Sequence, residues 1–313
     1  MFTSLAIVSL LTSAAVAQST SNPLIPSGIS SGCSSFLNNI NNDSGIKQCT
    51  QSLMDDTAGY APGGNTTTPT LAGMTSTLDK LCSGTNTACS EQAIRQALSD
   101  FYTQCSAELV GDQRNTQVIT IYDTLYTIIP MKQAVCGKDD SGRYCVTKSA
   151  SVVGGSSASP SGVKTNLADS NSWVGTIQNY LWSTSPTALS KRADAMFLNV
   201  TTYTERNIPF MFLTPDLDYN TLCTACTRST LTPYINFQSN TPYAPGLNNS
   251  VLLKRETELY QGIQKTCGPN FLSQVVQAAG GLSDGSSNGS FKVEVGLVTI
   301  FISVITMAVA SAL

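Results

Sequence analysis

The sequence predicts a mainly α-helical protein, a disulfide-stapled helical bundle with long loops rich in Ser, Gly and Pro. Apolar residues recur at intervals of three and four along several stretches, which is the spacing of a helix face that packs on a core. Ten cysteines lie between two apolar terminal runs, and an even number of cysteines in a secreted chain predicts disulfides. Helices joined by cross-links are therefore the expected architecture.

The composition allows a substantial core and excludes several kinds of function. The chain has 313 residues, of which 41% are hydrophobic, and this suffices for one or two domains. Charged residues make up 12% and the net charge is -3, so no basic surface for nucleic acid is expected. The chain contains no histidine, which excludes Ser-His-Asp and Cys-His catalysis and His-ligated zinc. No cofactor and no resident metal are expected.

Residues 1–17 are predicted to be a signal peptide. A short apolar run over residues 5–16 ends in Ala15-Val16-Ala17, which is a cleavage pattern of small residues. An N-terminal membrane helix, the alternative, would need an apolar span of about 20 residues. Residues 18–32 are rich in Ser, Pro and Gly and are expected to form an exposed lead-in.

Residues 33–148 are predicted to form an N-terminal cysteine-rich helical part. Apolar spacing favours two short helices around a turn at residues 41–45, then a loop over residues 59–70 and a helix that ends at Cys82. These helices precede the hairpin around which we expect the chain to pack.

The hairpin consists of two helices in succession. Ser90 can cap a helix over residues 91–109, and a partner helix over residues 118–135 repeats the apolar spacing. Pro130 is a position at which the partner helix can kink, and Gly137 is suited to a left-handed C-cap.

A polar turn at residues 138–143 closes the hairpin and carries Asp139 and Asp140. Neighbouring aspartates can bind calcium, but the D-x-[DN]-x-[DN]-G spacing and the following glutamate of a calcium loop are missing. A solvated turn is therefore predicted.

Residues 149–172 are predicted to be a flexible linker or loop, because they are mostly Ser, Gly, Ala and Pro. Residues 173–282 form a C-terminal cysteine-containing part. Within it, residues 196–203 have the β-branched and aromatic content of a strand, and Asp216 is placed to cap a helix. The sequence leaves open whether the two cysteine-containing parts form one domain or two.

The end of the C-terminal part is expected to be helical. Apolar spacing leads to Cys267-Gly268 and then to a last helix over residues 271–279. Trp173 and Trp182 could form a stacking platform for a sugar, but tryptophan more often fills a core, and core packing is expected.

All the cysteines are predicted to be structural. Cys223 and Cys226 have the spacing of a redox CxxC motif, but no thioredoxin-like βαβ pattern surrounds them. Connectivity stays open, because ten cysteines permit about 945 pairings. The predicted disulfide residues are Cys33, Cys49, Cys82, Cys89, Cys105, Cys136, Cys145, Cys223, Cys226 and Cys267.

The C-terminus has the layout of a glycosylphosphatidylinositol (GPI) signal. Residues 283–294 supply small residues and a short polar spacer, and residues 295–313 form an uncharged apolar tail that is removed on anchoring. Asn288 is the expected attachment site and Gly285 is the alternative. A single-pass membrane helix with no cytosolic domain is the competing interpretation.

Sequons for N-glycosylation occur at Asn42, Asn65, Asn199 and Asn248, and these are expected to carry glycans on exposed loops. Asn288 also lies in a sequon, but it should lack a glycan if it carries the anchor.

Four motifs carry cysteine or aromatic residues. They are Phe101-Tyr102-x-x-Cys105-Ser106-Ala107-Glu108-Leu109, Ile121-Tyr122-Asp123-x-Leu125-Tyr126, Leu222-Cys223-x-x-Cys226-Thr227-Arg228 and Pro242-Tyr243-Ala244-Pro245-Gly246-Leu247. In these motifs the chain resembles a family of fungal secreted proteins that is defined by a cysteine-rich domain of unknown function. The resemblance covers residues 33–282 and implies a fungal cell-surface protein, commonly with a predicted GPI anchor, but it implies no activity and no catalytic residue.

Two functional hypotheses follow. The first is a non-enzymatic, GPI-anchored glycoprotein at the outer face of the plasma membrane or in the cell wall, with a binding or structural role toward wall glycan or a surface protein. The second is a carbohydrate-active enzyme that uses two acids. Its candidate carboxylate pairs are Asp55-Asp56, Asp139-Asp140 and Asp216 with Asp218.

Overall fold

The computed structural model describes residues 24–40, 42–60, 71–83, 89–147, 182–184 and 196–272. This part of the chain is mainly helical and carries five disulfides, so the predicted fold class is confirmed. The predicted signal peptide, the 149–172 linker, the GPI region and the apolar tail lie outside these residues.

The first half of the fold consists of helices. In chain order they are α1 (Ser31–Ile40), α2 (Ser44–Thr57), η1 (Ala58–Tyr60), α3 (Leu71–Cys82), α4 (Glu91–Gln104), α5 (Ser106–Leu109) and α6 (Thr116–Val135).

The second half adds one small sheet and further helices. The strands β1 (Trp182–Thr184) and β2 (Met196–Leu198) pair antiparallel, with Ser183 opposite Phe197. The remaining elements are α9 (Val200–Glu205), η2 (Ile208–Phe210), α10 (Tyr219–Leu222), α11 (Ala225–Asn240), η3 (Leu247–Asn249) and α12 (Glu256–Cys267).

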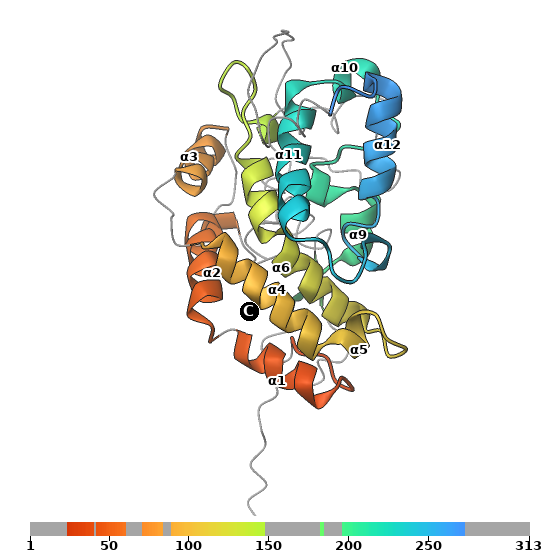
Figure 1. Ribbon diagram of the computed structural model, residues 1–313. Helices are drawn as coiled ribbons and strands as arrows, with labels where there is room; N and C mark the ends of the chain where they lie inside the picture. Colours follow the sequence, from red (N-terminus) through yellow and green to blue (C-terminus); the bar gives the residue numbers. More distant parts are fainter. Residues whose placement is uncertain are drawn as a thin grey trace, which may run out of the picture.

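Helix α6 is the centre of the molecule. It begins at Thr116 and is capped by Asn115, whose side chain accepts hydrogen bonds from the backbone N–H groups of Gln117 and Val118. Every residue from 122 to 131 is buried, which is typical of a helix that packs on all sides. Figure 1 shows α6 crossing the middle of the molecule with α4 and α11 packed on it. The helix continues through Pro130 to Val135.

The predicted first helix of the hairpin is wrong in its length. Helix α4 ends at Gln104, Cys105 is non-helical with φ −119° and ψ 21°, and the short α5 follows. Cys105 is fixed to Cys33 on α1, whereas Leu109 is buried where α5 packs on α6. The break lets the chain turn from one contact to the other.

Gly137 does not adopt the predicted left-handed conformation, since the positive-φ glycines of the described residues are Gly28, Gly142, Gly246 and Gly268. A Cβ atom at Gly137 would lie 2.1 Å from the Oγ atom of Ser229 on α11. Glycine is needed there because α11 approaches the backbone closely.

The strand predicted over residues 196–203 is only half correct. The strand stops at Leu198, and Asn199 then caps α9 by accepting a hydrogen bond from the backbone N–H of Thr202 at 3.3 Å. The cap predicted at Asp216 is also wrong. Asp218 caps α10 instead, because its carboxylate accepts from the backbone N–H of Thr221 at 3.1 Å.

One hydrophobic core takes residues from both halves of the chain, from Cys33 to Leu272. The lead-in predicted as exposed is partly packed on it. Ser27 and Gly28 are exposed, but Pro26 is buried, and Ile25 and Ile29 lie against the core. None of the described helices combines the length and the apolar character needed to cross a membrane.

Candidate functional site

The described chain pairs all ten cysteines, as predicted, and no described cysteine is free. The Cys223-x-x-Cys226 motif is no redox pair, since its two cysteines bond to different partners. The disulfides are Cys33–Cys105, Cys49–Cys89, Cys82–Cys136, Cys145–Cys226 and Cys223–Cys267.

The disulfides divide into three groups by what they join. Three lie within residues 33–136 and one lies within residues 223–267, so each half is stapled internally. Cys145–Cys226 joins the two halves across 81 residues of sequence. The hairpin cysteines Cys105 and Cys136 bond to α1 and α3, and they fasten the hairpin to its neighbours.

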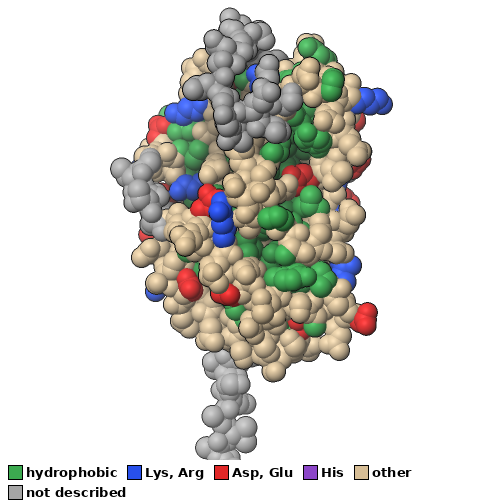
Figure 2. Space-filling model, viewed as in Figure 1, with side chains coloured by type: hydrophobic (Ala, Val, Ile, Leu, Met, Phe, Trp, Pro, Cys, Tyr) green, Lys and Arg blue, Asp and Glu red, His purple; other side chains and the backbone are tan. Residues whose placement is uncertain are grey.

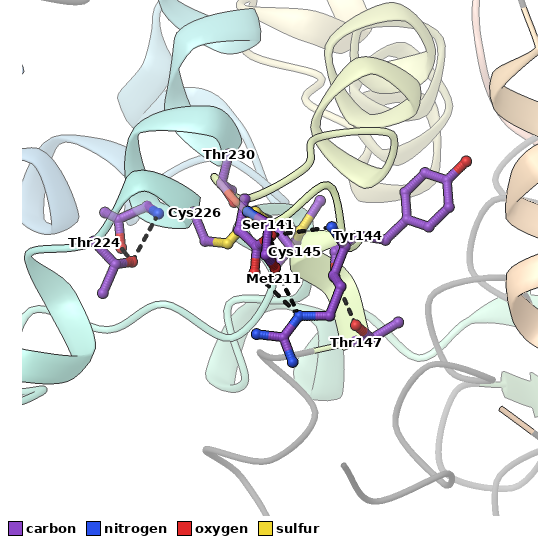
Figure 3. The surroundings of a disulfide bond; sticks show 11 residues. Ser141, Tyr144, Cys145, Thr147, Met211, Thr224, Cys226 and Thr230 are labelled. Atoms are coloured by element: carbon purple, nitrogen blue, oxygen red, sulfur yellow. Dashed lines mark hydrogen bonds and ion pairs between the residues drawn. A yellow bond between two sulfur atoms is a disulfide. The ribbon is translucent and has the colours of Figure 1, made fainter. Parts of the chain in front are cut away.

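The disulfide that joins the halves lies beside the polar turn. In Figure 3, Cys145 and Cys226 lie next to Met211 and Thr230, and the Thr230 hydroxyl donates to the Met211 sulfur at 3.6 Å. The turn itself is closed by Asp139, whose Oδ1 accepts from the backbone N–H of Ser141 at 2.8 Å and of Arg143 at 3.0 Å. Internal hydrogen bonds therefore account for this aspartate.

The most distinctive polar group of the fold is the carboxylate of Asp123, which is fully buried on α6. Its Oδ2 accepts from the Ser250 hydroxyl at 2.9 Å and from the backbone N–H groups of Val251 at 2.7 Å and Leu252 at 2.9 Å. Its Oδ1 accepts a hydrogen bond from the Tyr243 hydroxyl. All four donors come from residues 241–255, the connection between α11 and α12, which we call the strap.

A row of aromatic rings lies around the Asp123 carboxylate and includes residues from both halves of the chain. The Tyr243 ring meets the Tyr122 and Tyr126 rings edge-on, at 5.4 and 5.0 Å between centroids. Tyr126 continues to Phe237 on α11 at 5.0 Å. The Tyr126 hydroxyl also donates to the backbone carbonyl of Thr241, the first residue of the strap, at 2.5 Å. The strap is thus fixed by rings as well as by the carboxylate.

A second buried acid lies where the strap ends. Glu256, the first residue of α12, accepts a hydrogen bond from the Gln238 side chain on α11 at 2.6 Å. Burial raises the pKa of Glu256 to about 7, and the Gln238 hydrogen bond opposes this shift. Burial likewise raises the pKa of Asp123 to about 6, against its four hydrogen bonds. Asp123 is fully buried and Glu256 is only 8% exposed, so neither carboxyl is open to a substrate in this conformation.

A third buried acid, Glu108 on α5, lies beside the Cys33–Cys105 disulfide. Its Oε1 accepts from the backbone N–H of Ser30 at 2.6 Å. The two sulfur atoms and this carboxylate are close enough to ligate one metal ion, but disulfide sulfurs are not thiolates and make poor ligands. The contact ties the lead-in to the core.

The carboxylate pairs predicted from the sequence do not form a buried catalytic pair: Asp139 is held inside its turn with a side chain that is 6% exposed, and its neighbour Asp140 is exposed. Asp55 is exposed and accepts from the Gln51 side chain at 2.8 Å. Asp216 and Asp218 are exposed, and their pKa values lie below the usual range mainly because the Thr214 and Thr221 hydroxyls, respectively, donate to them. Such ionised groups are poor proton donors.

The predicted glycosylation residues lie in different settings. Asn42 and Asn248 are exposed, in the turn between α1 and α2 and in η3. Asn199 is half-buried and caps α9. Asn65 and Asn288 lie outside the described residues, as does Trp173; Trp182 lies in β1.

Sequence reasoning missed Asp123 and Glu256 as buried groups, although one signal was present. Asp123 is the only charged residue between Val118 and Met131, in an otherwise apolar helix. An isolated charge in such a run indicates a buried acid with partners from elsewhere. Glu256 offers no comparable signal, because Lys254, Arg255 and Glu258 surround it.

A domain of unknown function, DUF7729, spans residues 18–160 by its match to the model of that family. The matched stretch is less than half of the 313-residue chain. Neither a curated protein nor a solved structure matches this chain.

The matched stretch is not structurally independent of the rest of the chain. It contains α6 and Asp123, while the strap and α11 that cover them come from beyond residue 160. We infer that the fold needs residues of both regions to satisfy the buried carboxylate.

Proposed function

We propose that this chain is a secreted fungal glycoprotein, held by a GPI anchor at the outer face of the plasma membrane or in the cell wall. Its folded part acts in this proposal as a non-enzymatic binding or structural domain. The observation that carries the proposal is the pairing of all ten cysteines in five disulfides. Such a density of disulfides is typical of oxidising compartments and rare in the cytosol.

The anchor and the entry into the secretory pathway rest on the terminal sequences. The apolar run that ends in the cleavage pattern Ala15-Val16-Ala17 and the uncharged tail over residues 295–313 are the supporting features. The match to DUF7729 begins at residue 18, which is where the mature chain would start. The exposure of Asn42 and Asn248 is compatible with glycans at both positions.

The state of the acids favours a role without catalysis. A glycoside hydrolase needs two carboxyl groups in a cleft, one of them protonated near neutral pH. The described carboxyls with raised pKa values are buried, Asp123 under the strap and Glu256 beside Gln238 on α11, and the exposed Asp216 and Asp218 have lowered pKa values.

The surface is suited to neutral polar partners such as wall glycan or another surface protein. Figure 2 shows a face on which Lys, Arg, Asp and Glu side chains are scattered among each other, while uncharged groups cover most of the surface and hydrophobic side chains gather in patches between them. A surface of this kind offers hydrogen-bonding groups without a field of one sign.

Treatment of intact cells with phosphatidylinositol-specific phospholipase C tests the anchor. We expect the protein to move to the supernatant, and a variant that lacks residues 295–313 should reach the medium without treatment. A protein that stays on the membrane after cleavage of control anchors, and that only detergent frees, would instead have a membrane helix.

Incubation of the purified ectodomain with wall polysaccharides separates the two functional hypotheses. Retention on the polysaccharide without new reducing ends supports binding. New reducing ends would favour the alternative, a carbohydrate-active enzyme, and the matched variants Asp216→Asn and Asp218→Asn would then show whether this carboxylate pair is responsible.

A further inference from the structure

The sequon at Asn248 lies in the strap, and its three residues are held very differently. The Asn248 side chain is exposed. Ser250, whose hydroxyl completes the sequon, is only 3% exposed. Its Oγ donates to Asp123 at 2.9 Å and accepts from the backbone N–H of Leu253 at 2.8 Å. The hydroxyl therefore has both a donor and an acceptor partner inside the protein.

The backbone of the sequon is also fixed. The N–H of Asn249 donates to the carbonyl of Gly246 at 2.8 Å, and that of Ser250 donates to the carbonyl of Leu247 at 3.0 Å. The Asn249 carbonyl accepts from the Arg114 side chain at 3.3 Å, which ties the strap to the segment before α6. The backbone and the hydroxyl of the sequon are thus engaged in hydrogen bonds within the protein, whereas its asparagine side chain faces solvent.

Glycan transfer needs access to both ends of the sequon. The Nδ2 atom of Asn248 forms a bond to C1 of the first sugar of a lipid-pyrophosphate-linked oligosaccharide. The bond from C1 to the pyrophosphate oxygen breaks, the lipid pyrophosphate leaves with the bonding electrons, and the amide gives up one proton, which passes to solvent. The transferase recognises the hydroxyl two residues after the asparagine, so this hydroxyl must be free to bind it.

We propose that glycan transfer to Asn248 is confined to the time before the strap docks on Asp123, and that docking closes the sequon. This inference rests on the proposed passage of the chain through the secretory pathway. A glycan already in place does not prevent docking, because the Asn248 side chain points to solvent. Occupancy at Asn248 is then set by a competition between transfer and docking.

Asn42 provides an internal comparison. Its sequon ends in Ser44, which is exposed like Asn42 itself. No buried carboxylate holds the Ser44 hydroxyl among the described contacts. Docking of the strap should therefore leave modification at Asn42 unchanged.

The test uses the full chain made without glycans, with its disulfides formed. The native protein and the same protein after reduction, alkylation and unfolding are incubated with purified oligosaccharyltransferase and the lipid-linked donor. Peptide mass spectrometry measures occupancy at Asn248. We expect modification in the unfolded chain and a rate about tenfold or more lower in the native one, since local opening limits access.

A pair of variants tests whether this difference in rate depends on the Asp123 carboxylate. Asp123→Asn, in its disulfide-bonded form, should raise modification at Asn248 in the native state, whereas the exposed Asp55→Asn should leave it low. Equal rates in native and unfolded parent would overturn the proposal. So would absence of modification in the unfolded chain, because docking would then not be what closes the sequon.

The proposed secretory function fails by a different observation. In that case Asn42 and Asn248 would both lack glycans when the full chain is expressed in its own secretory pathway. The reconstituted comparison would still decide whether docking closes the sequon.

Discussion

The Tyr243 hydroxyl donates a hydrogen bond to the Asp123 carboxylate, which lies 120 positions earlier in the sequence. The contact joins the strap to the central helix, and Ser250, Val251 and Leu252 donate to the same group. A buried carboxylate with four donors is satisfied only when the strap is in place. The Asp123 carboxylate therefore makes the folding of each half of the chain depend on the other half.

Loss of the Asp123 carboxylate should destabilise the whole fold. Asp123→Ala leaves buried N–H and hydroxyl donors without an acceptor, and we expect the free energy of unfolding to fall by about 3 kcal/mol or more. Tyr243→Phe removes one donor and should cost about 1 to 2 kcal/mol. Urea unfolding followed by circular dichroism measures both. Asp55→Asn, at an exposed position, is the control. An Asp123→Ala protein as stable as this control would contradict the proposed contribution of the Asp123 carboxylate to stability.

The fold should become less stable as the pH rises from 5 to 8. The pKa values of Asp123 and Glu256 are raised in the fold, to about 6 and about 7, so folding favours their protonated forms. Their contribution is complete below the pKa of the unfolded chain and is lost as the pH rises through the folded values. For Glu256 the loss is at most about 3 kcal/mol.

Thermal unfolding across this pH range provides the measurement, with Glu256→Gln as the matched variant. The glutamine keeps the shape and cannot ionise, so its melting temperature should change less with pH than that of the parent. Identical pH profiles of the two proteins would show that ionisation of Glu256 does not destabilise the fold.

The Cys145–Cys226 disulfide should hold the two halves together after the chain is cut between them. A protease site engineered into residues 149–172 is cleaved, and the products are separated on a denaturing gel. We expect one band without reductant and two bands with it, because the other disulfides lie within one half or the other.

The double variants C145S/C226S and C82S/C136S give the matched comparison for this experiment. The first should yield two bands without reductant and the second should yield one. Two bands from cleaved parent protein without reductant would show that the cysteines pair differently.

A side chain at Gly137 should disturb the packing of α6 against α11. In Gly137→Ala, the new Cβ would lie 2.1 Å from the Oγ of Ser229 and 3.0 Å from the carbonyl oxygen of Ala134. We expect a loss of about 1 to 3 kcal/mol in the free energy of unfolding, the usual cost of overpacking. Ser229→Ala removes the nearest atom and should restore part of the loss. If Ser229→Ala restores none of the lost stability, the contact between residues 137 and 229 is not the cause of the loss.

The sequence alone determined the class of the fold and the positions of most helices. Periodic apolar residues and caps such as Ser90 act over three or four neighbouring positions, so they can be recognised without the fold. The even number of cysteines likewise predicted that all would pair, but not with which partners.

Only the tertiary structure decided the partners of the cysteines, the burial of Asp123 and Glu256, and the reason for Gly137. Each depends on surfaces that meet across separations in the sequence, from 18 residues for Gln238 and Glu256 to 129 for Asp123 and Leu252. The helix break at Cys105 goes with a long-range contact, because the disulfide to Cys33 holds the chain where the local helical pattern would have continued. Local sequence fixes which residues prefer a helix, whereas the packing of helices against one another selects which polar groups lose water and which must find partners.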